Sequence, residues 1–164
     1  MVSLRPATHN DIPGILAIVN HNILHSTAVY DYDPKDLQEM QSWFDEKLHA
    51  GWPVIVADGG GKVVGYGTYG TFRYKQGYRF TVEHSVYVTE SHAGKGVGKQ
   101  LLSELIAIAR ASGYHTMIGG IDAQNMGSIA FHKKFGFKEA GTIKEAGFKF
   151  GRWLDVTFMQ LMLD

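Results

Sequence analysis

A carboxylate stands in a run of residues that predicts a β-strand, Phe80 to Val88. Because side chains alternate along a strand, one face carries Glu83, Ser85 and Tyr87, and the other carries His84, Val86 and Val88. Partial burial raises the pKa of a carboxyl group, which suits a general base that takes a proton from an amine through a water. Glu83 is therefore a candidate base, and its alternative role is a plain ion pair with a nearby arginine.

A glycine-rich turn follows this strand, with the order Gly94, Lys95, Gly96, Val97, Gly98, Lys99. Glycines let successive backbone N–H groups point at one anion, and the start of the expected helix adds donors and positive potential. The spacing lacks the Gly-Lys-Ser/Thr of a P-loop and the third glycine of a dinucleotide fingerprint. The turn predicts a pyrophosphate site, and its alternative is an ordinary glycine-rich turn.

A basic and aromatic loop, Arg73 to Arg79, precedes the strand of Glu83. An arginine can bind a carboxylate through two hydrogen bonds, so Arg73, Tyr74 and Lys75 are candidate substrate contacts. The alternative is a solvated loop. Positive charge here argues against a polyamine as the acceptor, because like charges repel.

Composition limits the functions that remain. The chain has 164 residues, 45% of them apolar, with 16 basic and 16 acidic residues and no cysteine. Zero net charge gives no support for nucleic-acid or membrane binding, and it weakly favours an oligomer. The lack of cysteine excludes disulfides, thiolate–metal sites and a thioester intermediate on the protein itself. The eight histidines show no metal-site spacing, and without a signal sequence or membrane span we expect a cytoplasmic protein.

The expected elements alternate between strands and helices around these residues. A first strand ends near Arg5, a helix covers Asp11 to Asn22, and Asp33 with Pro34 begins a second helix that ends near His49. Further strands are expected at 53–57, 63–72, 115–121, 137–147 and 154–163, with a helix at 97–112 and a short one that begins at Asn125 or Ser128 and ends at Gly136. This order predicts one α/β domain, 1–164, with a mixed sheet and helices on both faces.

The turn and the later segments resemble the GCN5-related N-acetyltransferase (GNAT) family. Gly96 and Gly98 match its acetyl-CoA loop, Arg/Gln-x-x-Gly-x-Gly/Ala, while Ala93 replaces the usual Arg or Gln. Asn125 and the segment 130–137 are similar to the later family motif. A narrower resemblance, to phosphinothricin and methionine sulfoximine acetyltransferases, is carried by residues 4–7, 81–88, 150–155 and 159–160.

The resemblance implies a mostly antiparallel sheet, acetyl-CoA as co-substrate and no metal. It places the pantetheine along Val86, Tyr87 and Val88 and the pyrophosphate at residues 94–99, with further cofactor contacts from Asn125 and Ser128. Glu83 becomes the base, and His132 replaces the usual tyrosine that protonates the CoA sulfur, although a structural role in its helix stays open. Substrate contacts fall on Arg73 to Lys75 and on Glu83, His84 and Ser85.

The predicted reaction is direct attack by the amino group of a small amino-acid analogue on the thioester. Methionine sulfoximine, methionine sulfone and phosphinothricin are the expected acceptors, with resistance to such compounds as the consequence and a homodimer as the assembly. Two alternatives stay open. One is acetylation of another small amine or a protein N-terminus, and the other is a non-catalytic acyl-CoA-binding module.

Overall fold

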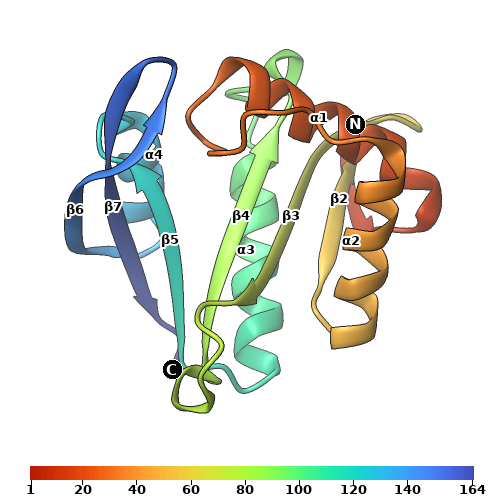
Figure 1. Cartoon of the computed structure of the whole chain (residues 1–164). Coiled ribbons are helices and arrows are strands. Elements are labelled where there is room, and N and C mark those ends of the chain that lie inside the picture. Colours follow the sequence, from red (N-terminus) through yellow and green to blue (C-terminus); the bar gives the residue numbers. More distant parts are fainter.

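One seven-stranded sheet runs through the molecule in the order β1-β2-β3-β4-β5-β7-β6 (Figure 1). The computed structural model describes all residues 1–164. Every neighbouring pair is antiparallel except β4 and β5, which are parallel. The strands are β1 (Ser3–Pro6), β2 (Val54–Asp58), β3 (Val63–Thr71), β4 (Thr81–Val88), β5 (Thr116–Asp122), β6 (Lys138–Lys149) and β7 (Arg152–Met162).

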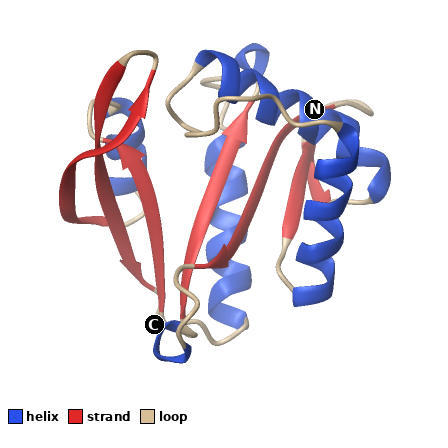
Figure 2. Cartoon of the chain, viewed as in Figure 1, coloured by secondary structure: helices blue, strands red, loops and turns tan.

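Helices cover both faces of this sheet (Figure 2). They are α1 (Ile12–His25) and α2 (Leu37–Ala50) on one face and α3 (Val97–Ala111) and α4 (Met126–Lys133) on the other, with single 3-10 turns η1 (His9–Asp11), η2 (Gln76–Tyr78) and η3 (Glu90–His92). The predicted mixed, mostly antiparallel sheet with helices on both faces is confirmed. None of the helices combines the length and the apolar composition that a membrane-spanning helix requires.

The core is divided between the two faces of the sheet. Leu101, Leu102 and Leu105 of α3 are fully buried in the larger cluster, which confirms the apolar face predicted for this helix. Tyr87 of β4 packs on the smaller cluster under α1 and α2, whereas Val86 packs on the larger one. The predicted alternation of β4 is therefore present, and Glu83 faces the α1 and α2 side.

The predicted start of the second helix is wrong. Asp33 and Pro34 lie outside α2, which begins at Leu37. Asp36 accepts a hydrogen bond from the Glu39 amide at 2.8 Å, and the Glu39 carboxylate accepts one from the Asp36 amide at 2.7 Å. This reciprocal pair satisfies two donors at once, which proline at the first helical position does not do.

The C-terminal hairpin is longer than the sequence predicted. β6 continues to Lys149 and β7 begins at Arg152, so only Phe150 and Gly151 form the turn, with φ angles of 54° and 72°. Lys149 is buried and donates to the carbonyls of Ser26 and Val29, at 2.8 and 2.5 Å. These bonds fasten the α1–α2 loop to the hairpin and give Lys149 a role inside the fold.

β4 and β5 are paired only at their beginnings. Their register joins Thr81–Glu83 to Thr116–Ile118 and stops there. The two strands then spread apart toward the top of the view (Figure 1). From His84 onward, the edge of β4 that faces β5 has no partner strand.

Candidate active site

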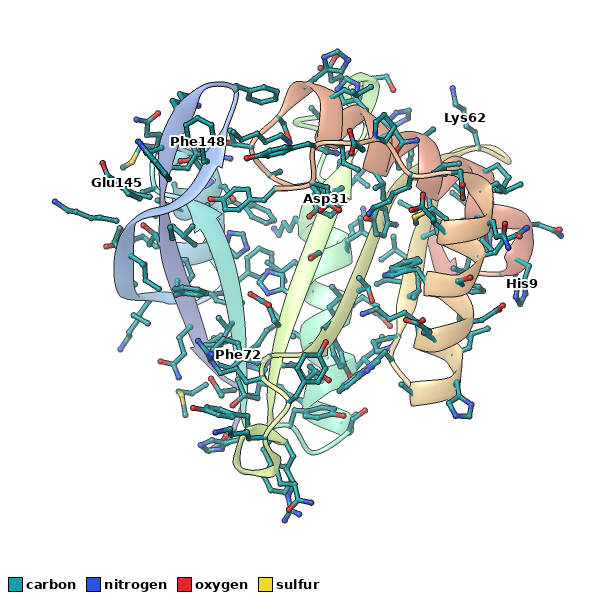
Figure 3. All side chains as sticks on the ribbon, in the orientation of Figure 1. His9, Asp31, Lys62, Phe72, Glu145 and Phe148 are labelled. Atoms are coloured by element: carbon teal, nitrogen blue, oxygen red, sulfur yellow. The ribbon has the colours of Figure 1, made fainter.

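A cavity of about 530 Å³ opens where β4 and β5 separate. This size suits a small-molecule site. The predicted residues that line it are Glu83, His84, Ser85, Val86, Tyr87, Val88, Gly98, Asn125, Ser128 and His132. The α1–α2 loop closes one side, and Figure 3 marks this loop with Asp31 near the upper end of β4 and shows Phe148 on the hairpin across from it.

Glu83 is half-buried in the wall of the cavity. Burial raises the pKa of its carboxyl group, and the nearby Arg73 guanidinium partly opposes this shift. No side chain or backbone group donates a hydrogen bond to the carboxylate, so its oxygens are available to a water or a substrate. A carboxyl group in this state can act as a base near neutral pH.

His84 and His132 meet inside the same cavity. Their Nε2 atoms lie 2.9 Å apart, and the side chains are buried, at 6% and 8% exposure. Burial lowers the pKa of His84 to about 3 and also lowers the pKa of His132. His84 faces away from Glu83 along β4, but the divergence of β4 from β5 still leaves both residues in the cavity wall.

The glycine turn adopts the conformation that its sequence predicts. Gly94 and Gly96 have φ angles of 74° and 82°, in the left-handed region, and Gly96 is the N-cap of α3. No backbone carbonyl accepts a hydrogen bond from the amides of Val97, Gly98 or Lys99. These three donors at the start of a long helix are free to receive hydrogen-bond acceptors such as the oxygens of a pyrophosphate.

Only part of this turn reaches the cavity. Gly98 lines it, and a Cβ there would lie 3.7 Å from both Phe131 and Val88, which is ordinary contact distance. Gly94, Lys95, Gly96 and Lys99 do not line the cavity, and the Val97 side chain is buried in the core. An elongated ligand could therefore run from the cavity to the amides at the start of α3.

Asn125 has a defined local role at the entrance to α4. It is the N-cap, and its side-chain oxygen accepts a hydrogen bond from the Ser128 amide at 3.1 Å. Both residues line the cavity as well. Of the two helix starts that the sequence offered, Asn125 and Ser128, the structure has Asn125 as the cap, and the free amide nitrogen of Asn125 still has a donor for a ligand.

The loop of Arg73, Tyr74 and Lys75 lies at the other end of β4. All three side chains are exposed, Tyr74 at 97%, and none lines the cavity. Arg73 stacks on Phe72 and is close enough to Glu83 to influence its pKa. Figure 3 shows Phe72 at this lower end of the sheet.

Sequence reasoning missed the rest of the cavity wall. Asp122 ends β5 and accepts a hydrogen bond from the Thr27 hydroxyl at 2.6 Å. Tyr30 joins the wall from the α1–α2 loop. Gly119 and Gly120 lie together within a buried strand, where glycine often marks close approach of another group, and this signal was readable in the sequence. The structure contains no group of three or more His, Asp or Glu side chains that could hold a metal ion.

Comparisons with known proteins agree with this geometry. A model of the Acetyltransferase (GNAT) domain matches residues 4–158. The L-methionine sulfoximine/L-methionine sulfone acetyltransferase of Pseudomonas paraeruginosa is 49% identical, over 99% of this chain and 95% of that protein. The crystal structure of an N-acetyltransferase from Staphylococcus aureus Mu50 has a TM-score of 0.99 and 44% identity, covering 100% of this chain and 99% of that one. A GNAT superfamily phosphinothricin acetyltransferase from Sinorhizobium meliloti, solved in complex with acetyl-CoA, has a TM-score of 0.94 and 40% identity, covering 98% and 88%.

Proposed function

The chain belongs to the GNAT acetyltransferase family, and we propose that it transfers an acetyl group from acetyl-CoA to the α-amino group of a small amino-acid analogue. One observation carries the proposal. A half-buried carboxylate, Glu83, shares a single cavity with an unpaired strand edge and with the start of α3. A base and a place for a long acyl donor are thereby adjacent.

Acetyl-CoA would lie along the open edge of β4. Its pyrophosphate would accept hydrogen bonds from the free amides at Val97 to Lys99, with the positive charges of Lys95 and Lys99 nearby. The pantetheine arm would pair with backbone groups of Val86 to Val88, which lack a partner strand. Asn125 and Ser128 would contact the arm from α4. Support comes from the relative from Sinorhizobium meliloti, which was solved in complex with acetyl-CoA.

The chemistry needs one base and one acid. The amine attacks the thioester carbonyl carbon directly in its neutral form, and Glu83 takes, through a water, the proton that the nitrogen loses as the amide forms. A backbone N–H near Val86 stabilises the oxyanion. The carbon–sulfur bond then breaks, and His132 supplies the proton that the thiolate requires. With no cysteine in the chain, no thioester forms on the protein.

Methionine sulfoximine, methionine sulfone and phosphinothricin are the acceptors that we propose. The names of two relatives support this class. Each acceptor combines a carboxylate, an amine and a tetrahedral polar head. Arg73 would bind a polar end of the acceptor, beside Glu83, His84 and Ser85, with Tyr74 and Lys75 farther out on the loop.

Thiol release across a panel of amines tests the proposal. Methionine sulfoximine, methionine sulfone and phosphinothricin should release CoA thiol from acetyl-CoA at least tenfold faster than polyamines or a peptide N-terminus. Glu83→Gln should reduce kcat/KM by about 10²–10⁴-fold while acetyl-CoA affinity stays unchanged. Binding of acetyl-CoA with no turnover on any amine would instead indicate a non-catalytic acyl-CoA-binding module.

We also propose a single domain, a homodimer and a cytoplasmic location. Support for self-association comes from large apolar side chains exposed on the β6–β7 hairpin, namely Ile143, Phe148, Phe150 and Trp153, at 45–62% exposure. Apolar surface of this kind commonly marks an interface. Resistance to the acetylated analogues would follow from the proposed activity.

A further inference from the structure

The imidazoles of His84 and His132 form a continuous chain of hydrogen bonds. The chain begins at the Ile118 carbonyl, 3.1 Å from His84 Nδ1, and passes through the 2.9 Å contact between the two Nε2 atoms. It ends at the Ser128 carbonyl, 2.7 Å from His132 Nδ1. All four ring nitrogens are therefore engaged within the protein.

Counting protons along this chain shows that two neutral imidazoles cannot satisfy it. Both end positions face carbonyl oxygens, which only accept, so each Nδ1 must carry a proton. The Nε2–Nε2 contact needs a third proton. Two neutral imidazoles supply only two protons, so one of the three contacts would bring two lone pairs together. One additional proton, and with it one positive charge on the pair, completes the chain.

The surrounding residues hold the two rings in this arrangement. Phe137 packs on both rings, with centroid distances of 5.4 Å to His84 and 5.2 Å to His132. Gly119 of β5 leaves the space that the His84 ring occupies, because a Cβ at Gly119 would lie only 2.7 Å from the His84 Cε1 atom. The contact between the Nε2 atoms therefore follows from packing on several sides.

The charged side chains that share the cavity with the pair are acidic. Two carboxylates, Glu83 of β4 and Asp122 of β5, line the same cavity, and no lysine or arginine lines it. The other titratable groups are the hydroxyls of Tyr30 and Tyr87 in the cavity wall and of Tyr69, whose backbone lies opposite His84 on β3. Burial lowers the pKa of both imidazoles, and the neighbouring His132 lowers that of His84 further, so it is the count of hydrogen bonds, and not the surroundings, that requires the additional proton.

From this geometry we propose that His84 and His132 work as one proton-holding pair, and that the proton shared by their Nε2 atoms is the one delivered to the departing CoA thiolate. The inference rests on the proposed acetyltransferase function. His84 is the residue that it adds. In this role His84 keeps His132 supplied with a transferable proton, which a single neutral imidazole with Nδ1 bound to a carbonyl does not have.

The step balances in atoms and charge. The amine nitrogen forms its bond to the carbonyl carbon, and the electron pair of the carbon–sulfur bond leaves on sulfur. The shared proton moves to that sulfur, which gives the CoA thiol and a neutral pair. The proton lost by the amine nitrogen goes to Glu83 and then to solvent, and the pair takes one proton back from solvent.

Nitrogen-15 NMR of the histidine rings in the wild-type protein tests the pair directly. Titration from pH 5 to 9 should show the two imidazoles changing together in a single step, with both Nδ1 atoms protonated throughout. His49, which is exposed on α2 and does not line the cavity, serves as the internal control. Two rings that stay neutral over this range, or that titrate independently, would overturn the proposal.

His84→Gln supplies the kinetic test, since its amide fits a hydrogen-bonding site but takes up no proton. We expect kcat to fall at least tenfold, the KM for acetyl-CoA to stay within about threefold, and the alkaline limb of the pH–rate profile to move while the acidic limb stays. His49→Gln is the matched control. An unchanged alkaline limb contradicts the proposal, and if the variant does not fold the wild-type NMR result decides. If no amine is acetylated, the proposed function fails while the NMR experiment still tests the pair.

Discussion

Replacing Gly119 with alanine should disturb both the fold and the histidine pair through one methyl group. The new Cβ would lie 2.7 Å from the His84 Cε1 atom, closer than two carbon atoms can approach. The ring has little freedom to retreat, because both of its nitrogens are hydrogen-bonded and Phe137 packs against it. Either β5 or the ring must shift.

The magnitude follows from overpacking of a buried site. Extra methyl groups in well-packed cores cost about 1–3 kcal/mol. For a domain of this size each kcal/mol lowers the Tm by about 2–4 °C, so we expect a fall of about 2–12 °C. Loss of the Nε2–Nε2 contact should also lower kcat at least tenfold. This corresponds to a rise of about 1.4 kcal/mol or more in the activation free energy.

Thermal unfolding and CoA thiol release measure the two effects on the same preparation. Gly141→Ala is the matched control, because Gly141 also lies in a strand and a Cβ there would meet nothing within 4 Å. It should leave both the Tm and kcat close to their wild-type values. A Gly119→Ala protein with wild-type Tm and kcat would refute the packing argument and the position of the His84 ring.

Substitutions at three other positions separate roles at and around the site. Glu83→Gln should remove the acidic limb of the pH–rate profile. In the wild type the midpoint of this limb should lie above the ordinary carboxyl pKa of 4.5, because burial raises the pKa of Glu83. A limb retained in the variant would exclude Glu83 as the base. Asn125→Ala should lower the Tm by about 2–4 °C through loss of the helix cap and raise the KM for acetyl-CoA, while Asn125→Ser should restore only the Tm. Burial lowers the pKa of Lys47 to about 8 from 10.5. The charged ammonium group therefore destabilises the folded protein fully below pH 8, and this destabilisation disappears as the pH rises from 8 to 10.5. Lys47→Met should therefore be most stabilising, relative to wild type, below pH 8, by up to roughly 3 kcal/mol; a pH-independent difference would contradict this.

Local signals in the sequence predicted the cofactor half of the site well. Strand, glycine turn and helix follow one another between residues 81 and 111, so their geometry depends on neighbouring residues. Gly94 and Gly96 adopt the positive φ angles that favour glycine, and the apolar face of α3 is buried as its spacing predicted. The roles of these residues toward acetyl-CoA stay predictions.

Contacts between distant segments were not readable in the same way. His84 and His132 are 48 residues apart, and the Thr27 hydroxyl meets Asp122 across 95 residues. The sequence placed His84 on the face opposite Glu83, which is correct for a regular strand, but only the divergence of β4 from β5 brings both into one cavity. The start of α2 was wrong for a related reason, because two possible caps, Asp33 and Asp36, lie close together in the sequence.

The separation of β4 from β5 costs the fold the hydrogen bonds that a closed sheet would make from His84 to Val88. The same separation exposes a strand edge to a ligand, opens the wall that contains Glu83 and leaves room for an imidazole against Gly119. The bonds of Thr27 to Asp122 and of Lys149 to the carbonyls of Ser26 and Val29 tie the α1–α2 loop to β5 and to the end of β6, across the gap. Since these bonds cross the gap without filling it, the open edge is held as part of the fold, and a bound acyl donor can supply the pairing that β5 does not.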